Sequence, residues 1–405
     1  MRDDCQAFKE TLVIRNLGPL TDVVLDDIRP VMVLLGKSGS GKSLILKALA
    51  MMRHVCKKQL IRRALKASGV SKTSFRIRKD SYLKFADIEN LISGSTYLEY
   101  RLEWGGAFCR ITFAKRGFGA DFSDFQRQDD AGPFLKIAFI SDSRNLLASW
   151  ARKGAGVRSK VLDNYFSETY DLWDEALSAK MSSHQEIRYL GVQLAISKGK
   201  NGRQEVAIVN EKGHNTLFER GASGEKASIP VSIILRYLMW GFNFADAVQR
   251  SYLKDLLEAI IENSNDALPT LPPGGKIASF DQFYLCAHVE EPELSLDPQT
   301  QLLFADDLIR NMEPVEHDNR RVCASIAFTT HSPYWVTALN TIAEEGESSF
   351  LTWERLCGYL VRDDGTVLPL RDEESRVLMT PNMDKASFEI DDRYNAALDR
   401  REAQP

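Results

Sequence analysis

The sequence predicts an α/β protein with a mixed or mainly parallel sheet core flanked by helices, an antiparallel β lobe and a helical insertion. The first observation is an apolar run, Val31–Leu35, that leads into a glycine-rich loop and then a helical pattern. The second is a pair of later apolar runs, 283–289 and 322–328, each ending in a polar turn. Short apolar runs of this kind are typical of strands buried on both faces of a parallel sheet. The third is a pair of hairpin signals, Gly105-Gly106 and Asn201-Gly202.

The composition is that of an ordinary soluble globular protein, since 44% of the 405 residues are hydrophobic and 27% are charged. The length suggests one large domain with insertions, or two domains. The net charge of −4 gives no general attraction to nucleic acid or to an anionic membrane. The most apolar long stretch, 229–242, contains Arg236 and is too short to span a bilayer, and the polar first ten residues are unlike a signal peptide. We therefore expect a cytoplasmic protein without a membrane segment.

The cysteines are scattered and form no C-x-x-C pair. We expect reduced, mostly buried thiols rather than a disulfide framework or a zinc site. The six residues are Cys5, Cys56, Cys109, Cys286, Cys323 and Cys357.

The glycine-rich loop matches the phosphate-binding pattern G-x-x-x-x-G-K-S. Glycines allow backbone N–H groups to turn inward around a phosphate chain, and the helix expected from Leu44 presents its positive end to the same place. Lys42 would reach the β- and γ-phosphates and Ser43 would bind Mg²⁺. A fortuitous glycine-rich turn is the alternative. The loop residues are Gly36, Lys37, Ser38, Gly39, Ser40, Gly41, Lys42 and Ser43.

The other elements of the first part of the chain follow from local patterns. Apolar runs and alternation predict strands, a helical apolar spacing predicts a helix after the loop, and residues 117–132 have the polar, aromatic composition of a loop. The expected strands are 11–15, 23–25, 97–104, 107–113 and 134–140, and the expected helix is 51–68.

In the second part, residues 145–185 contain two helical stretches broken at 154–156, and we expect an inserted helical subdomain. A hairpin (191–196 and 205–209), helices (230–248 and 252–262), a proline-glycine loop (268–275), edge strands (358–370) and a charged tail with a helix near its end follow. We expect four regions: 1–144, the N-terminal lobe; 145–188, the helical insertion; 189–370, the C-terminal lobe; and 371–405, the tail.

One stretch has charges of a single sign, because no Asp or Glu occurs from Ile28 to Lys79. Its cations include Lys58 and Arg62, which lie at i, i+4 spacing, where like charges repel one another. Such a surface could face an anion such as a nucleic-acid backbone, and Lys58, Arg62 and Arg63 are then the candidate DNA contacts. The alternative is a solvated helix face balanced by acidic residues elsewhere.

Two of the apolar runs end in residues suited to phosphoryl transfer. Glu290 and Glu291 follow the run 283–289, where one carboxylate could assist Mg²⁺ and the other could polarise the attacking water. His331 follows the run 322–328 and could donate a hydrogen bond to a γ-phosphate oxygen. A solvated turn is the alternative for two glutamates taken alone.

A further anion site is possible at the start of a later helix. Ser223, Gly224 and Glu225 stand there, and backbone N–H groups at a helix N-terminus favour anions. A second phosphate-binding helix end suggests a nucleotide shared between two subunits. An ordinary glycine-serine helix cap is the alternative.

Taken together, GKSGSGKS, ASGEK, VEEPELSLDP and TTHSP occur in the order of the ABC-type ATPase heads of the RecF, SMC/Rad50 and OLD group. The chain resembles these heads from about residue 11 to about residue 335. It is especially similar to the compact AAA-type ATPases of bacterial anti-phage defence operons, such as those of the Septu and PARIS systems.

The resemblance implies that Glu290 assists Mg²⁺, that Glu291 is the general base and that His331 is the switch histidine. It also implies ATP and Mg²⁺ as cofactors and a homodimer or higher homo-oligomer. The remaining positions are the Walker A loop Gly36–Ser43, the signature residues Ser223, Gly224 and Glu225, and the D-loop residue Asp297.

The chain departs from the family pattern in places. Ala222 stands where the family usually has serine, and Ser38 replaces a common asparagine. There is no obvious glutamine loop, although residues 141–144 lie in a plausible place.

Three functional classes follow from these features. The first is a nucleotide-gated sensor or scaffold for an effector protein, a toxin or nuclease, in anti-phage defence. The second is a DNA-binding ATPase of repair or recombination. The third is a transporter's nucleotide-binding subunit, which the absence of a membrane-coupling segment disfavours.

Overall fold

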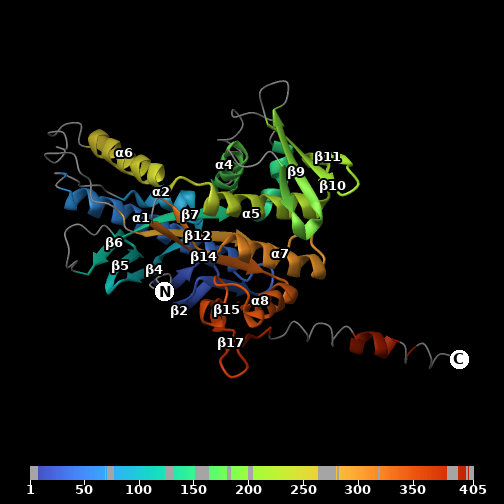
Figure 1. The fold of residues 1–405 in the computed structure, drawn as a ribbon. Helices are drawn as coiled ribbons and strands as arrows, with labels where there is room; N and C mark the ends of the chain where they lie inside the picture. The colour runs from blue at the N-terminus through green and yellow to red at the C-terminus, as the bar shows by residue number, and fades with distance from the viewer. Residues whose placement is uncertain are drawn as a thin grey trace.

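The computed structural model describes residues 8–68, 70, 77–123, 132–150, 164–179, 184–198, 204–262, 280, 282–317, 320–380, 391–397 and 400. At its centre lies a sheet whose main strands are parallel (Figure 1). In order across the sheet they are β16 (Val367–Pro369), β15 (Leu356–Val361), β3 (Val31–Leu35), β14 (Arg320–Thr330), β12 (Gln282–Glu290) and β7 (Pro133–Ile140). Only β16 and the short β13 (Val315–His317) pair antiparallel, at β15 and β14. The predicted mixed, mainly parallel core is confirmed.

Two antiparallel sheets accompany the core sheet. The first consists of β2 (Leu20–Ile28), β1 (Lys9–Leu17), β4 (Ile92–Trp104), β5 (Ala107–Ala114) and β6 (Gly117–Phe122). The second consists of β11 (Asn215–Leu217), β10 (Gln204–Asn210), β9 (Val192–Lys198) and β8 (His184–Ile187). A two-stranded ribbon, β17 (Arg371–Asp372) with β18 (Val377–Leu378), follows the core near the C-terminus.

The helices cover both sides of the core sheet. The first long helix, α1 (Lys42–Ala67), contacts β7, β12 and β14 on one side and β4 and β5 on the other. Figure 1 places α4 (Asn164–Ser178) and α5 (Ser223–Trp240) on the side away from β4–β6. The other helices are α2 (Lys79–Phe85), α3 (Leu147–Trp150), α6 (Phe244–Glu262), α7 (Pro298–Asn311) and α8 (Pro333–Glu345).

Several local predictions differ from the structure. Residues 117–122 form strand β6 rather than loop, because pairing with β5 overrides their glycine-rich composition. Helix α5 begins at Ser223 instead of Pro230, since a proline near the N-terminus of a helix does not have to be its first residue. Strand β15 pairs with β3 and is an interior strand, although the sequence suggested an edge. The predicted helix break at 154–156, the predicted hairpin turn at 201–202 and the predicted loop 268–275 lie outside the described residues.

A buried ion pair joins the first antiparallel sheet to α1. The Arg53 guanidinium donates from Nε and Nη2 to the two carboxylate oxygens of Glu10, each at 2.8 Å, and both side chains are almost fully buried. The hydroxyls of Tyr100 and Tyr284 also donate to Glu10, at 2.5 and 2.7 Å. Arg53 Nη1 lies 3.0 Å from Nε2 of His288, which therefore accepts. One buried cluster thus connects β1, β4, α1 and β12.

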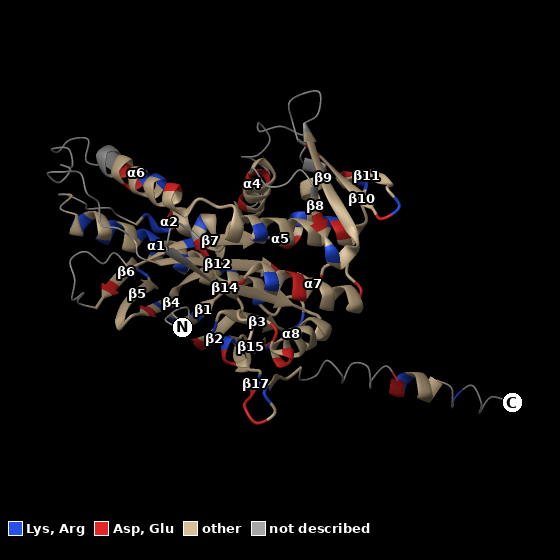
Figure 2. Cartoon of the chain, in the orientation of Figure 1, with Lys and Arg blue, Asp and Glu red and all other residues tan. Residues whose placement is uncertain are grey.

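Among the described residues of the stretch 28–79, Lys58 and Arg62 are not free surface cations. Lys58 makes ion pairs with Asp255, at 3.0 Å, and with Glu258, both from α6. Arg62 is buried, and the guanidinium of Arg63 lies 5.0 Å from the ring centroid of Phe122. Figure 2 shows charges of both signs on α6 beside the basic residues of α1. Lys58 is therefore neutralised by acidic residues distant in sequence, and Arg62 is not at the surface, which favours the alternative of a balanced helix face; DNA contact through Lys58, Arg62 and Arg63 stays a prediction.

The prediction of reduced, mostly buried cysteine thiols is confirmed only in part. Among the described cysteines, Cys56, Cys109, Cys286 and Cys357 are free and buried, but Cys323 is disulfide-bonded. Spacing along the chain does not reveal which thiols the fold brings within bonding distance. In the described part of the chain, no helix combines the length and apolarity that a bilayer crossing requires.

We predict that Glu10→Gln lowers the free energy of unfolding by about 3–5 kcal/mol, because it leaves the Arg53 charge buried without its counterion. Chemical denaturation measures the change. The matched control is Asp22→Asn, which breaks the exposed Arg15–Asp22 pair and should cost at most about 1 kcal/mol. Equal small effects of both changes would contradict the structural role given to the buried pair.

Candidate nucleotide site

The predicted site residues converge because parallel strands end on the same side of a sheet. Strand β3 runs directly into the phosphate loop, β14 into His331, β12 into Glu291 and β7 into Ser141. Neighbouring strands are paired up to these ends, with Glu290 opposite Thr329. Four segments distant in sequence therefore meet at one edge.

The phosphate loop has the backbone shape that its glycines allow. At Gly36, a Cβ atom would lie 2.6 Å from the carbonyl oxygen of Val361. Gly41 has φ 103°, and a Cβ there would lie 2.7 Å from a methyl carbon of Leu20. Side chains at these two positions would therefore disrupt the turn into α1. Within the loop, the N–H of Ser40 donates to the carbonyl oxygen of Lys37 at 3.2 Å.

Lys42 lies at the centre of this edge. Its ammonium donates to the carbonyl oxygens of Gly36, at 2.9 Å, and Lys37, at 2.7 Å, and lies 3.4 Å from Nδ1 of His331. Burial lowers the pKa of Lys42 to about 8, while the charge of Glu291 opposes this shift. The lysine thus connects the loop with the ends of β12 and β14.

Two other loop residues have different surroundings. The Lys37 side chain is exposed and forms an ion pair with Asp363 at 2.8 Å. The hydroxyl of Ser40 is buried and has no hydrogen-bond partner among the described residues. An unpaired buried hydroxyl in a loop shaped for phosphate fits a nucleotide.

Glu290 has the surroundings expected of a residue that assists Mg²⁺. Its carboxylate is 5% exposed, accepts a hydrogen bond from the Ser43 side chain, and lies 3.4 Å from the N–H of Asp142. Burial, followed by the Asp142 charge, raises the pKa of Glu290 to about 7. Among the described residues, no three His, Cys, Asp or Glu side chains group closely enough to hold a metal ion alone. Hydroxyl and carboxylate oxygens together with substrate phosphates are the ligands Mg²⁺ usually takes, so these residues fit it.

Glu291 is held in an unusual backbone conformation. Its φ is 43°, a left-handed value that is uncommon for a residue other than glycine. Its N–H donates to the carbonyl oxygen of Thr329 at 3.0 Å, and its carboxylate lies 3.1 Å from Nε2 of His331. The predicted base and the predicted switch histidine are therefore in direct contact.

A third carboxylate, which the sequence analysis did not assign, positions His331. Glu293 accepts from the N–H of His331 at 2.8 Å and from the hydroxyl of Thr330 at 2.7 Å. Burial raises its pKa. Its position two residues after Glu291, beyond Pro292, was the available signal.

Arg144 belongs to the segment 141–144, a weak candidate for the glutamine loop in the sequence analysis, which gave this residue no role of its own. It lies in the short 3-10 helix η3 (Asp142–Leu146) after β7 and is completely buried. All four of its hydrogen bonds go to backbone carbonyl oxygens: Glu290 at 2.6 Å, Glu291 at 2.6 Å, Ser141 at 3.1 Å and Ala227 at 2.6 Å. Burial lowers the pKa of Arg144 to about 10. An arginine four residues after the end of a buried strand was the signal in the sequence.

The signature residues form a second cluster. Ser223 is exposed at the start of α5, and the Glu225 carboxylate accepts from the N–H of Ala222 at 2.6 Å. Alanine has no polar side chain, so Glu225 caps this helix end. A Cβ at Gly224 would lie 2.9 Å from the carbonyl oxygen of Ser295, in the segment after β12. No hydrogen bond or ion pair links Ser223, Gly224 or Glu225 to the phosphate loop within the described chain.

Asp297 lies next to this second cluster. Its carboxylate accepts from the N–H groups of Gln299, at 3.0 Å, and Thr300, at 3.1 Å, and so caps α7. Hydrogen bonds, first of all from the Thr300 side chain, lower its pKa. Its predicted role at a subunit interface stays a prediction.

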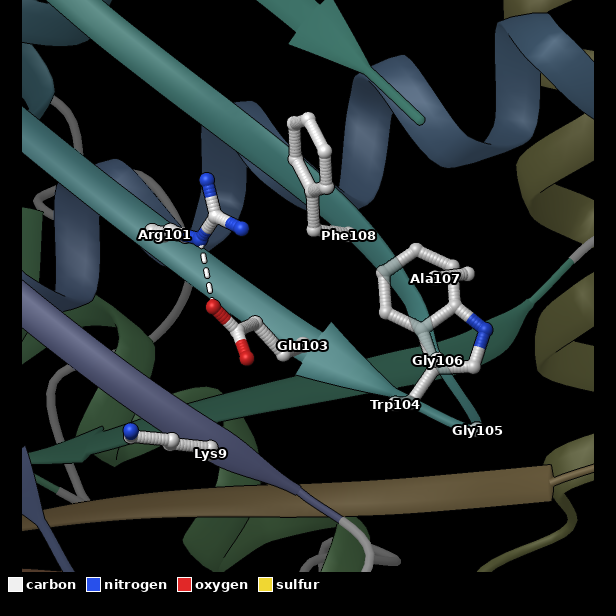
Figure 3. A pocket seen from close by; sticks show the side chains of 8 residues that line it. All are labelled: Lys9, Arg101, Glu103, Trp104, Gly105, Gly106, Ala107 and Phe108. Carbon is white, nitrogen blue, oxygen red and sulfur yellow. Dashed lines mark hydrogen bonds and ion pairs between the residues drawn. The ribbon is translucent and has the colours of Figure 1, made fainter. Parts of the chain in front are cut away.

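A separate hollow lies at the hairpin turn between β4 and β5 (Figure 3). Its volume of about 180 Å³ is smaller than that of ordinary ligand pockets. The Arg101 guanidinium there binds Glu103 at 2.6 Å. This turn follows the last residue of β4. The first residue of that strand, Ile92, lies at its other end and pairs with Leu17, and it is this end that lies nearer the phosphate loop. We therefore do not assign this hollow to the nucleotide site.

Among comparisons with known proteins, only the comparison with solved structures finds similar proteins. No protein-family model matches the sequence, and no curated protein matches it. Solved structures that are similar include an SMC head domain from Thermotoga maritima, with 14% identity, a TM-score of 0.40 and coverage of 90% of this chain and 100% of that chain. An SMC head bound to the C-terminal winged-helix domain of ScpA has 12% identity, a TM-score of 0.41 and coverage of 90% and 98%. The recombination mediator RecF with ATP has 10% identity, a TM-score of 0.33 and coverage of 90% and 100%. Similarity at this level carries no argument about activity or partners.

We predict that Glu290→Gln changes how stability depends on pH. A carboxyl whose pKa is raised from 4.5 to about 7 on folding binds its proton more tightly in the folded state, so its contribution to stability is lost as pH rises through this interval. Without nucleotide or Mg²⁺, the variant should gain about 2–3 kcal/mol relative to the unchanged chain between pH 4.5 and 7.5.

Chemical denaturation across this pH range is the measurement. Glu345→Gln, at an exposed position of α8, is the control and should follow the unchanged chain. A Glu290→Gln difference that does not vary with pH would show that this carboxyl is not the buried titrating group.

Proposed function

We propose that the chain is an ATPase that binds ATP with Mg²⁺ at the carboxyl edge of its parallel sheet. The observation that carries the proposal is the contact chain from Lys42 to His331 to Glu291, beside the nearly buried Glu290. Phosphoryl transfer requires a cation, a hydrogen-bonding group, a base and a metal ligand around the phosphates. Lys42, His331, Glu291 and Glu290 would supply these four functions beside the phosphate loop.

In the proposed reaction, water attacks the γ-phosphorus in line with the bond to ADP. Glu291 accepts the proton of the attacking water as the new oxygen–phosphorus bond forms, and the bond to the β,γ-bridging oxygen breaks, so that ADP leaves with the electron pair. Lys42 neutralises charge on the β- and γ-phosphates, and His331 donates to a γ-phosphate oxygen. Ser43 and Glu290 would hold Mg²⁺, which would supply further charge neutralisation when bound.

We further propose that two copies of the chain complete each site. Ser223 is exposed at the N-terminus of α5, against which the Asp297 segment packs through Ser295. Among the described residues, no hydrogen bond or ion pair joins Ser223 or Asp297 to the phosphate loop of the same chain. A helix N-terminus that presents free N–H groups favours an anion. Head-to-tail pairing of two chains would bring Ser223 of each to the ATP on the other, and Asp297 into the interface.

The most specific form of the proposal is a nucleotide-gated scaffold. ATP closes the assembly, hydrolysis opens it, and an effector protein, a toxin or nuclease of a bacterial anti-phage module, responds to the closed state. DNA binding by a repair-type ATPase is the alternative. It loses support because Lys58 is ion-paired within the chain and Arg62 is buried.

We predict that Glu291→Gln slows ATP hydrolysis by roughly 10²–10⁴-fold while ATP still binds, because the amide cannot accept the proton of the attacking water. Phosphate release measures turnover, and a fluorescent ATP analogue measures binding. Glu345→Gln serves as the control with unchanged turnover. Hydrolysis at the unchanged rate by Glu291→Gln would show that the base lies elsewhere.

We predict that Lys42→Ala and Ser223→Arg chains are each inactive but regain partial ATPase activity when mixed. A mixed dimer has one doubly damaged site and one site with an intact phosphate loop and an intact signature helix. Ser223→Arg alone should still bind ATP but should not assemble with it, as light scattering would show.

The control for the mixing experiment is a mixture of Lys42→Ala with Glu291→Gln, which damage the same half of a shared site. That mixture leaves no intact site and should stay inactive. If neither mixture recovers, and turnover per chain of the unchanged protein is independent of its concentration, the shared site is excluded.

A further inference from the structure

We propose that Arg144 is a positioning residue that makes the base Glu291 respond to the signature helix α5. The inference rests on the proposed function and assigns a means of communication within that site. One guanidinium hydrogen-bonds the carbonyl oxygens of Glu290, Glu291 and Ala227. It therefore links the end of the carboxylate strand to the first turns of the helix that begins at Ser223.

The first step of the argument is the cost of burying this group. Arg144 is completely buried, and all its hydrogen bonds are to backbone carbonyls rather than to a carboxylate. Burying a cation without a directly bound counterion is expensive. Its planar fork can, however, join several carbonyls from different segments in a fixed geometry, which a neutral side chain of similar size cannot do.

The second step is the backbone at Glu291. Glu291 has a φ of 43°, and such a left-handed conformation is strained for a non-glycine residue and persists only when its surroundings hold it. Thr329 binds the N–H of Glu291, and Arg144 binds its carbonyl oxygen at 2.6 Å. In this turn the carboxylate contacts His331, so loss of the Arg144 bond would release the carboxylate from that position.

The third step is the connection to α5. The bonded carbonyl, that of Ala227, lies four residues after Ser223, which is about 6 Å along the helix. Ser228 adds stiffness there, because its hydroxyl donates to the carbonyl oxygen of Gly224 and accepts from Tyr189. A displacement of Ser223 by the nucleotide of the opposing subunit would move the Ala227 carbonyl with it. A shift of 1 Å would already lengthen the 2.6 Å bond beyond ordinary hydrogen-bond distance.

The inference predicts that Arg144→Met separates assembly from turnover. The phosphate loop and the exposed end of α5 remain, so ATP binding and ATP-dependent assembly should change less than threefold. The turnover number should fall 10–100-fold, and assembly should no longer raise turnover per chain. A merely structural role would instead weaken ATP binding, assembly and turnover together.

The matched control is Thr329→Val, which removes the hydroxyl that lies 3.3 Å from the Glu291 N–H but leaves the link to α5. It should lower turnover while turnover per chain still rises with protein concentration. The experiment measures ATPase rate against protein concentration, with assembly followed in parallel by light scattering. Arg144→Met turnover that still rises with concentration as in the unchanged chain would overturn the inference.

A second measurement covers the case in which Arg144→Met does not fold. Hydrogen exchange of the segment 288–296 is compared between Glu291→Gln assembled with ATP and Ser223→Arg bound to ATP as a monomer. The coupling predicts different protection of this segment in the two states, and equal protection would overturn it. If the unchanged chain neither hydrolyses ATP nor assembles with it, the proposed function itself fails. If the unchanged chain does both and the Arg144→Met chain has the same turnover and concentration dependence, only this inference fails.

Discussion

The parallel pairing of β3, β14, β12 and β7 is the constraint on which the site depends. In parallel strands, the carboxyl ends lie at one edge, so a loop that follows each strand faces the loops of its neighbours. The pairing of Glu290 with Thr329 fixes where β12 and β14 end relative to each other. A shift of this register by one residue would turn Glu290 and Glu291 to the wrong sides of the sheet. The contacts among Lys42, His331 and Glu291 follow from that register.

Buried charges mark the places where segments distant in sequence meet. The pair formed by Glu10 and Arg53 joins the first antiparallel sheet to α1, and Arg144 joins β12 to α5. Each charge is costly to bury, so it is stable only where several hydrogen bonds from different elements converge on it. Such groups stabilise one arrangement of the elements more than they stabilise folding in general. Around the proposed nucleotide site, burial raises the pKa values of Glu290 and Glu293.

The proposed site has two halves, one around the phosphate loop and one at the start of α5, and among the described residues only the first has its side chains in contact within a single chain. His331 contacts both Lys42 and Glu291, and the Arg144 guanidinium binds the backbone carbonyl oxygen of Glu291. Ser223, by contrast, is exposed at the start of α5. The first half is organised within one chain, whereas in the proposed shared site a second copy of the chain would complete the other half. Arg144 is the physical connection between the two halves.

The sequence by itself determined the short-range features. The phosphate loop, its strand and the residues that end β12 and β14 could be predicted because local spacing dictates a strand, a tight turn and a helix in succession. It could not show that Asp255 and Glu258 neutralise Lys58, that Arg144 reaches Ala227, or that residues 117–122 form a strand. These outcomes depend on pairings between residues 7 to 200 positions apart, such as Gly119 with Thr112 and Lys58 with Glu258, and only the tertiary structure decides them. Local patterns limit what a segment can form, while the energies of burial and long-range pairing select what it does form.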